Sequence, residues 1–515
     1  MGPPARTGGP PVPRPTQLRR LAVAAATTVA LAGALTTGSA SAARTAPEPP
    51  STPVPIVTPD GEVFSYVLNA KHANPGQTRL VTRAVERSGG VVVQAWPQIG
   101  VVVAHSDRAA FRADVARSAG KALESVGATR TVPVSEVAPA AGTSARRSAA
   151  ADAAATRKAD DVEARSSKPV PTDPREVEQW DMQMIKADHA HDITDGSRKV
   201  LVGVLDSGID PDHPDLVANL DVKRSVNCTD SGRPSSTGWE PTTSDHGTHV
   251  AGTIAAARNG VGIVGVAPNV RLASVKVVND DGFIYPEYAV CGFVEAGLKH
   301  MDVTNNSYYV DPFEFYCDDQ PDQHAAKEAV RRAVTWSTKQ GVVHAAAAGN
   351  SGKDLSDKTL LTDTGSPDDG TPVTRTLNNT CGDIPTELDG VVTVSSVERF
   401  PTDTLGSRLS SFSNRGLGVI DVAAPGSRIL STVVADNGYG LKSGTSMASP
   451  HVAGVLALMK SAHPSWKPAK MIQKLRQQAD DKACSAATGG VPCVGTTRNN
   501  SYFGEGMVDA LDAVG

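Results

Sequence analysis

The stretch Ser443-Gly444-Thr445-Ser446-Met447-Ala448-Ser449-Pro450-His451 decides how this 515-residue chain is interpreted. It places Ser446 in a run of small residues, directly before an apolar segment at residues 452–459 that is compatible with a helix. The first turn of a helix carries unpaired N–H groups and the positive end of the helix dipole, which favour a developing oxyanion. Ser446 is therefore a candidate nucleophile, although a serine in this place can also be a simple N-cap.

Two upstream segments supply the partners that a serine nucleophile needs. Asp206 follows an apolar run at residues 200–205, and His246 precedes another run of small residues. A serine hydroxyl is a weak nucleophile until a base takes its proton, and a carboxylate orients that base. Asn350 ends a further apolar run and offers an amide donor for an oxyanion. Each residue alone has an ordinary structural explanation, but the four together predict a serine peptidase.

The region from residue 173 to residue 515 alternates apolar runs with helical patterns. The apolar runs lack a clean alternation, which is typical of parallel strands buried on both faces. Strands are expected at residues 200–205, 271–278, 341–348, 391–397 and 419–424. Helices are expected at residues 286–300, 324–339 and 449–461. The pattern predicts an α/β fold of three layers with a mostly parallel central sheet, whose active site lies at the carboxyl ends of the strands.

The N-terminus has the pattern of an export signal. Three arginines, Arg14, Arg19 and Arg20, precede an apolar stretch at residues 21–35, and small residues follow it. This order predicts a signal peptide over residues 1–42. The stretch is shorter than the roughly 20 residues of a membrane span, and no later segment reaches about 18 apolar residues. We expect a secreted, extracellular protein without a membrane anchor in its mature form; an N-terminal anchor is the alternative.

A small α+β unit precedes the α/β region. Residues 62–134 carry a β-α-β-β-α-β pattern, which predicts a ferredoxin-like arrangement. Its strands are expected at residues 63–68, 90–94, 100–105 and 126–134, and its helices at residues 78–87 and 108–118. Residues 135–172 are rich in Ala, Ser, Arg and Asp without apolar periodicity, which predicts a disordered linker. A polyalanine helix is the alternative there.

The three motif segments resemble those of the subtilisin-like (subtilase) serine peptidases, over residues 173–515 and in the same order. The resemblance implies that Asp206, His246 and Ser446 form a catalytic triad working through an acyl-enzyme, with Asn350 and the Ser446 N–H as the oxyanion hole. Residues 62–134 resemble the inhibitor-type propeptide of the same family. This implies an autoprocessed zymogen whose own propeptide is an intramolecular inhibitor, with the maturation cut inside residues 135–172.

The resemblance also implies a structural calcium site. The family binds calcium through an aspartate and a loop that gives one asparagine and several carbonyls, and calcium prefers about six to eight such oxygen ligands. The corresponding residues here are Asp215, Asn259 and the carbonyls of Ala257, Val261 and Ile263, completed by Asp173 or Glu176. Arg258 departs from the asparagine often found in this loop. A calcium-free loop held by hydrogen bonds is the alternative, and no organic cofactor is expected.

The substrate-binding segment that the resemblance implies departs from the family pattern. Subtilases bind extended peptides as added strands, and the corresponding residues here are Ser307, Tyr308 and Tyr309. The usual pattern is Ser-Leu-Gly, so Tyr309 replaces a glycine that helps to form the substrate pockets. We expect the substitution to reshape these pockets, and residues 311–323 to form an insertion at their rim.

Six cysteines agree with an oxidising compartment. They allow 15 pairings in principle. Cys484 and Cys493 bracket a glycine-rich loop and are expected to pair, and the favoured completion is Cys228 with Cys291 and Cys317 with Cys381. A zinc site would need closely spaced cysteine pairs, which the sequence lacks.

The composition excludes few classes of function, but it agrees with the prediction of a serine peptidase. The net charge is −5, with 40% hydrophobic and 20% charged residues, and no basic patch or motif indicates nucleic-acid binding. The predicted function is a secreted, monomeric serine endopeptidase acting on proteins or peptides. Two alternatives stay open: an inactive subtilase-like protein that binds peptides in the same cleft, and an esterase or amidase that uses the same triad.

Overall fold

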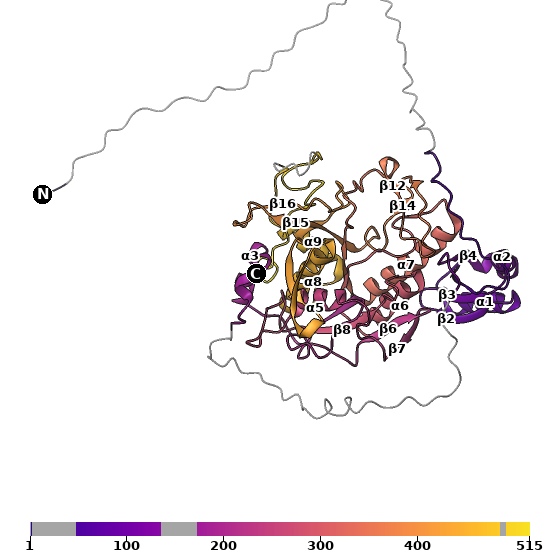
Figure 1. Ribbon diagram of the computed structural model, residues 1–515, viewed down its shortest axis with the longest axis horizontal. Helices are drawn as coiled ribbons and strands as arrows, with labels where there is room; N and C mark the ends of the chain where they lie inside the picture. The colour runs from indigo at the N-terminus through magenta and orange to yellow at the C-terminus, as the bar shows by residue number, and fades with distance from the viewer. Residues whose placement is uncertain (1, 3–47, 135–171, 485–490) are drawn as a thin grey trace, which may run out of the picture. The chain divides into compact units, whose positions relative to one another are not determined.

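The structure is a computed structural model that describes Gly2 and residues 48–134, 172–484 and 491–515 (Figure 1). The signal peptide predicted for residues 1–42 and the linker predicted for residues 135–172 lie outside the described residues, apart from Gly2 and Thr172. Within the described ranges, none of the helices combines the length and the apolar character that crossing a membrane requires.

A nine-stranded sheet forms the centre of the α/β region, with strand order β16-β15-β11-β9-β5-β8-β6-β7 and β17 paired to β15. Every pair is parallel except the two at the ends, β15 with β16 and β6 with β7. The strands are β5 (Leu201–Asp206), β6 (Val226–Asp230), β7 (Arg233–Ser235), β8 (Arg271–Lys276), β9 (Val303–Asn306), β11 (Val343–Ala347), β15 (Val391–Arg399), β16 (Ser407–Leu409) and β17 (Val422–Pro425). The mostly parallel central sheet is therefore confirmed.

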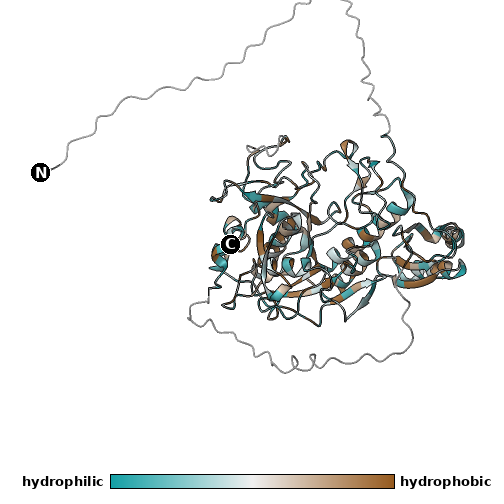
Figure 2. Cartoon of the chain, in the orientation of Figure 1, coloured by the Kyte–Doolittle hydropathy of each residue, from teal (hydrophilic) through white to brown (hydrophobic). Residues whose placement is uncertain are grey.

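Both faces of this sheet are buried, which explains the near-continuous apolar runs in the sequence. In β5, Leu201 and Leu205 belong to one hydrophobic core, whereas Val202 and Val204 belong to the other. Figure 2 shows the resulting brown, apolar strands in the interior of the α/β region. Alternate residues of one strand thus serve two cores, so no polar alternation is needed.

Helices cover the two faces and complete the three layers. The helices α5 (His246–Ala255) and α8 (Thr445–Ala462) share a core with Val202 and Val204. The helices α6 (Pro286–Leu298) and α7 (Pro321–Gln340) share the other core with Leu201 and Leu205. The predicted three-layer fold is confirmed.

The N-terminal unit has the predicted β-α-β-β-α-β order. Its four strands form an antiparallel sheet in the order β2-β3-β1-β4. Its elements are β1 (Phe64–Ala70), α1 (Pro75–Arg87), β2 (Val91–Trp96), β3 (Val101–Ser106), α2 (Phe111–Ala119) and β4 (Leu123–Ala128). The last strand ends at Ala128 rather than at residue 134, because Arg130 leaves the sheet to pair with Glu287 at the start of α6 (2.5 Å).

The strand β9 was missed in the sequence because it is polar. Its residues Thr304, Asn305 and Asn306 are fully buried, and their side chains bond one another and neighbouring segments. Shorter elements complete the fold: α3 (Trp180–Met184), α4 (Ala187–His191), β10 (Tyr316–Cys317), β12 (Thr362–Asp363), β13 (Arg375–Thr376), β14 (Cys381–Gly382), β18 (Ile429–Thr432), β19 (Tyr439–Lys442), α9 (Pro468–Gln478) and the 3-10 turns Gly120–Ala122, Glu176–Glu178, Lys358–Leu360 and Ala435–Asn437.

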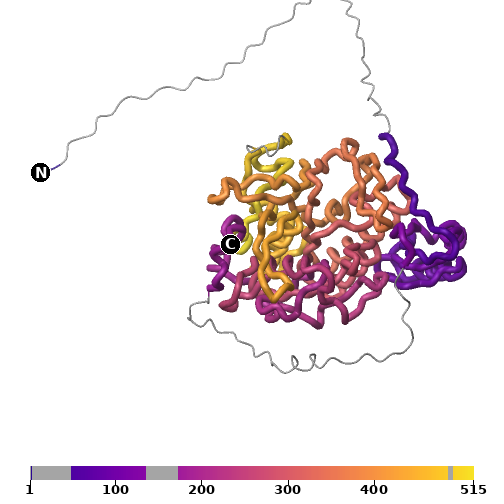
Figure 3. Tube along the Cα trace, viewed as in Figure 1, coloured from indigo at the N-terminus to yellow at the C-terminus, as the bar shows by residue number. Residues whose placement is uncertain are grey.

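Covalent and terminal contacts close the α/β region. The six cysteines form the three expected pairs, Cys228–Cys291, Cys317–Cys381 and Cys484–Cys493. The C-terminal segment returns to α3 and α4, as the tube in Figure 3 traces, where the Ala510 N–H donates to the Ile185 carbonyl (2.8 Å).

Candidate active site

The four residues singled out in the sequence lie at one edge of the central sheet. Asp206 is the last residue of β5, and Asn350 comes three residues after the end of β11. The strand β9 lies between β5 and β11 and is parallel to both, so all three carboxyl ends open at the same edge. His246 and Ser446 sit in the first turns of α5 and α8.

Asp206 and His246 form a direct pair. The His246 Nδ1 atom lies 2.8 Å and 2.9 Å from the two carboxylate oxygens of Asp206, which is 1% exposed. Gly247 permits this approach, because a Cβ atom there would lie 2.4 Å from the Gly208 carbonyl oxygen and 3.0 Å from Asp206 Cβ. A buried carboxylate on Nδ1 fixes the tautomer that leaves Nε2 free to accept a proton.

The environment of His246 tunes its basicity. Desolvation lowers the pKa of the imidazole, but the charge and hydrogen bond of Asp206 outweigh it, so that the pKa of His246 lies above its usual value. The ring is still 31% exposed, which leaves a face open to a substrate. This arrangement suits a general base that works near neutral or alkaline pH.

Ser446 is held from the β9 side. Ser307 Oγ donates to the Ser446 carbonyl (2.9 Å), and Ser446 Oγ donates to the Ser307 carbonyl (3.3 Å). Ser449 fixes the same turn, since its hydroxyl donates to Asn305 Oδ1 (2.7 Å). In this structure the Ser446 hydroxyl therefore points toward Ser307, and it would have to rotate to give its proton to His246.

The amide of Asn350 is oriented by the residue before Ser446. Its Oδ1 atom accepts from the Thr445 N–H (2.8 Å) and from the Thr445 hydroxyl (2.9 Å). Both acceptor contacts lie on the oxygen, so the NH₂ end is left to donate elsewhere. The contacts thereby settle the amide orientation that an oxyanion donor needs.

A cavity of about 330 Å³ adjoins Ser446 and Asn350. The substrate-binding residues expected from the sequence, Ser307, Tyr308 and Tyr309, form one wall. The predicted insertion contributes Asp311 and Glu314. Asp383 also lines the cavity, and sequence reasoning missed it, because the only signal was one aspartate ahead of an apolar strand.

The residues expected to bind calcium are brought together, with one exception. Asp173 and Asp215 are 1% and 0% exposed, Asp173 Oδ1 accepts from the Asn259 N–H (3.2 Å), and Asp215 Oδ2 accepts from the Ile263 N–H (3.1 Å). Gly262 is required here, because it has a φ of +61° and a Cβ atom would collide with Tyr439. Glu176 instead pairs with Arg258.

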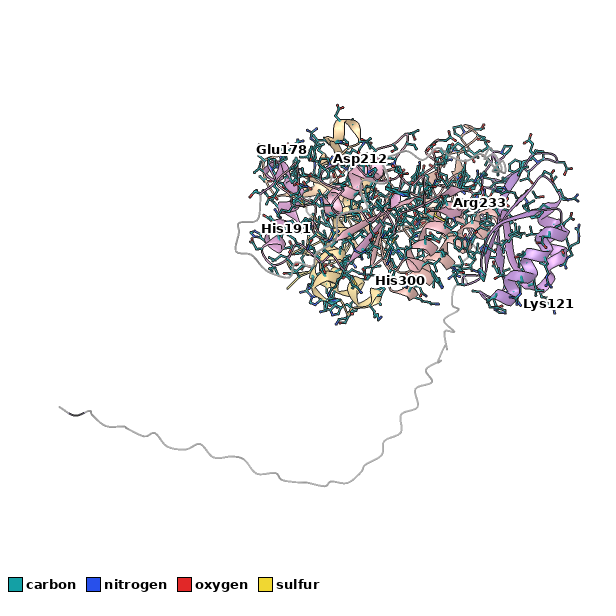
Figure 4. The ribbon with its side chains drawn as sticks, turned by 90° about the horizontal axis from the view of Figure 1, so that it is seen from below. Lys121, Glu178, His191, Asp212, Arg233 and His300 are labelled. Atoms are coloured by element: carbon teal, nitrogen blue, oxygen red, sulfur yellow. A yellow bond between two sulfur atoms is a disulfide. The ribbon has the colours of Figure 1, made fainter. Side chains whose placement is uncertain are left out.

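Arg258 points away from this loop toward a separate cluster. Its guanidinium pairs with Glu176 and with Asp195 (3.4 Å), and it donates to His191 Nδ1 (2.9 Å). His191 and Glu178 lie at the same end of the ribbon in Figure 4. The positive charge of Arg258 is therefore neutralised by Glu176 and Asp195.

The donor set of the loop fits a cation. Burial raises the pKa of Asp173 and of Asp215, and the charge of Asp215 adds to the rise at Asp173. Asp173 Oδ2 is buried and has no hydrogen-bond partner among the described residues. An orphaned carboxylate oxygen beside a second buried carboxylate, an asparagine and loop carbonyls is an arrangement that calcium would satisfy.

The other histidines of the motifs have structural partners. His451 bonds the Met447 carbonyl (2.8 Å) and Asp181 Oδ2 (2.9 Å). His249 Nε2 lies 3.1 Å from the carbonyls of Ile429 and Gly440, and burial lowers the pKa of His249 to about 4. Such a weakly basic imidazole, whose Nε2 already faces two carbonyls, is a poor proton acceptor, which agrees with the choice of His246.

Comparisons with known proteins agree with this geometry. The family described as "Subtilase family" matches residues 197–506. Subtilisin E of Bacillus subtilis is 33% identical over 334 residues, covering 65% of this chain and 70% of that protein. M-protease of Shouchella clausii is 33% identical over 336 residues, covering 64% and 68%.

Solved structures show the same fold. The epidermin leader peptide processing serine protease of Staphylococcus aureus aligns with a TM-score of 0.62 at 20% identity, over 88% of this chain and 98% of that one. Fervidolysin from Fervidobacterium pennivorans aligns with a TM-score of 0.59 at 21% identity, over 88% of this chain and 61% of that one.

Proposed function

This chain belongs to the subtilase family of serine peptidases, and on that premise we propose that Asp206, His246 and Ser446 are its catalytic triad. The observation that carries the proposal is the buried Asp206 carboxylate 2.8 Å from His246 Nδ1, at the sheet edge where Ser446 starts a helix. We further propose that the protein is a secreted endopeptidase made as a zymogen.

The chemistry would run in two halves. The Ser446 hydroxyl rotates from Ser307 to His246, gives its proton to Nε2 and attacks the scissile carbonyl carbon. Asp206 stabilises the imidazolium, which then protonates the leaving amine as the C–N bond breaks. Water enters, loses a proton to His246 and hydrolyses the acyl-enzyme by the same steps in reverse order.

Asn350 would stabilise the tetrahedral intermediate. Its oxygen is held by Thr445, so its NH₂ group is free to donate to the oxyanion, alongside the Ser446 N–H at the start of α8. Donors fixed before the reaction need no reorganisation when the charge develops.

Two features support export. The sequence of residues 1–42 has the order of a signal peptide. Three disulfides use all six cysteines, which suits an oxidising compartment.

The contacts of the N-terminal unit support a role as propeptide. Its strands β1 and β4 pack on α7, and the sheet shares one hydrophobic core with α6 and α7. Polar contacts also join the two parts. Arg130 pairs with Glu287, with side chains 3% and 0% exposed. The Ala128 N–H donates to Asp322 Oδ1 (2.9 Å). Beyond this pair, the Thr131 N–H donates to Asp368 (3.1 Å), two residues after Ser366 of the cavity wall. These contacts support a propeptide that stays bound to the peptidase region before it is cleaved.

We also propose that the loop of Asp215 and Asn259 holds a structural calcium ion, with Asp173 completing the carboxylate pair. The ion would supply the positive charge that two buried carboxylates otherwise lack. Its role would be to tie residues near the mature N-terminus to the loop after α5.

A fluorophosphonate probe tests the proposal. We expect wild-type protein to be labelled at Ser446 and to cleave casein, and Ser446→Ala to do neither while keeping its thermal melting temperature. An inactive peptide-binding protein would remain unlabelled, and an esterase would be labelled but leave casein intact.

A further inference from the structure

The cavity beside Ser446 contains a buried carboxylate without a counter-ion in contact. Asp383 lines the cavity and is 1% exposed. Its Oδ1 atom makes no hydrogen bond with any described residue. A Cβ atom at Gly349, which also lines the cavity, would lie 3.7 Å from Asp383 Oδ2, so the carboxylate sits beside the turn that carries Asn350.

The neighbouring acidic groups differ from Asp383 because each has partners. Asp311 accepts from the Ile284 N–H (2.6 Å) and from the Ser366 hydroxyl. Glu314 accepts from Ser351 Oγ (3.0 Å) and pairs with Lys353.

The nearby lysines are also engaged. Lys353 bonds Glu314, and Lys358 bonds Glu387 (2.6 Å). Neither lysine lines the cavity. Once these two pairs are matched, Asp311 and Asp383 are the acidic groups of the cavity wall that no ammonium group of the described residues contacts directly.

An isolated buried carboxylate is unfavourable unless a cation or hydrogen-bond donors compensate it. Burial first, and then the charges of Glu387 and Glu314, raise the pKa of Asp383 well above its usual value, although Lys358 and Lys353 oppose the rise. A ligand that brings a positive charge into the cavity would relieve this cost, whereas an apolar ligand would leave it.

The position of the cavity identifies which part of a substrate enters it. A scissile carbonyl must place its carbon at Ser446 Oγ and its oxygen toward the Asn350 amide. The side chain of the residue that owns this carbonyl is then the one next to both groups, and both groups line the cavity. The cavity therefore receives the residue before the scissile bond, named P1.

We propose that this cavity selects a basic P1 side chain, with Asp383 as the specificity-determining residue, so that the enzyme cleaves after arginine and lysine. The inference rests on the proposed role of Ser446 as nucleophile. Glu314, at the same wall, adds a weaker contribution because Lys353 already neutralises it.

Matched fluorogenic peptides that differ only at P1 test the inference. Arginine is compared with citrulline, its uncharged isostere, and with leucine. We expect kcat/KM for arginine to exceed that for citrulline roughly 100-fold in the wild type, the size expected when a buried charge loses its partner. In Asp383→Asn the arginine-to-citrulline ratio should fall to within about fivefold of unity, whereas Glu314→Gln should keep most of it.

The outcomes separate the two proposals. Protein that takes up the fluorophosphonate but shows an arginine-to-citrulline ratio near one, or prefers leucine, overturns the basic-P1 inference alone. Protein that is not labelled and cleaves none of the peptides overturns the triad and this inference together. If Asp383→Asn does not fold, the arginine-to-citrulline ratio of the wild type still tests the inference. Its pH dependence is a further test, because protonation of Asp383 should lower this ratio as the pH falls.

Discussion

The two sides of the cleft are built differently. The catalytic side, formed by Asp206, His246, Asn350 and Ser446, comes from short motifs whose residues meet through direct hydrogen bonds or shared turns. The acidic side, formed by Tyr309, Asp311, Glu314 and Asp383, comes from two separate loops, one between β9 and β10 and one after β14. Asp383 has an oxygen that nothing in the described chain satisfies. The first side is complete by itself, whereas the second needs a ligand.

Residues that carry out a reaction and residues that select a substrate differ in whether they have partners in the free protein. A reaction needs fixed donors and acceptors, so its residues have partners in the free protein. A selective pocket can leave a charge uncompensated, because the cost is recovered only when the correct substrate binds. Changes on the catalytic side should therefore alter kcat for every substrate, whereas changes at Asp383 should alter the preference between substrates.

Removal of the nucleophile should give the largest effect. We expect Ser446→Ala to lower kcat about 10⁶-fold, the family's own magnitude, for every P1 residue alike. Hydrolysis of matched peptides and the melting temperature measure this. A loss confined to arginine substrates would contradict the assignment of Ser446 to the catalytic side.

Removal of the oxyanion donor should be the next largest. Asn350→Leu should lower kcat about 10²–10³-fold with little change in KM, again as in the family, because the lost bond forms only in the transition state. Single-turnover kinetics with a leucine and an arginine substrate provide the measurement. A variant that retained full kcat, or that changed only in KM, would exclude Asn350 from this role.

The dependence of kcat/KM on pH should distinguish the two sides of the cleft. Below the pKa of the group concerned, the measured quantity should change about tenfold per pH unit. His246 must be neutral to act, and its pKa is raised by Asp206, so kcat/KM for a leucine substrate should rise with pH through a midpoint above the ordinary value of about 6.5. Asp383 must be charged to bind arginine, and its pKa is raised by burial. The arginine-to-leucine ratio should therefore also rise with pH, and Asp383→Asn should flatten the ratio while leaving the leucine midpoint in place.

Calcium removal should affect neither side directly. Chelation by EDTA, or Asp173→Asn, should lower the melting temperature by roughly 5–10 °C, which corresponds to loss of a ligand present well above its Kd. The arginine-to-leucine ratio of the protein that stays folded should be unchanged. Melting that ignores EDTA would favour a loop held by its own hydrogen bonds.

The sequence predicted the fold and the grouping of the four motif residues at one sheet edge, because both depend on local patterns. Apolar runs such as residues 200–205 mark buried strands, and small residues around Ser446 mark a crowded helix start. The strand Val303–Asn306 escaped detection since its buried side chains are polar and satisfied by one another. The role of Asp383 was not predicted because it depends on Glu314 and Asn350, which are distant in sequence and come together only at the cavity.

The rotation of Ser446 and the choice between calcium ligands were also beyond the sequence. The hydroxyl donates to the carbonyl of Ser307, directly after β9, and no sequence motif indicates this contact. Glu176 and Asp173 are equivalent candidates by composition, but in the structure Glu176 pairs with Arg258, whereas Asp173 accepts from the Asn259 N–H of the loop.

A cleavage-site profile on a peptide library, recorded for wild type and Asp383→Asn in parallel, tests the central claim most directly. We expect the wild type to cut after arginine and lysine, and the variant to lose this preference but still cut. Cleavage by the wild type after leucine, phenylalanine or tyrosine, or identical profiles for the two proteins, would contradict it.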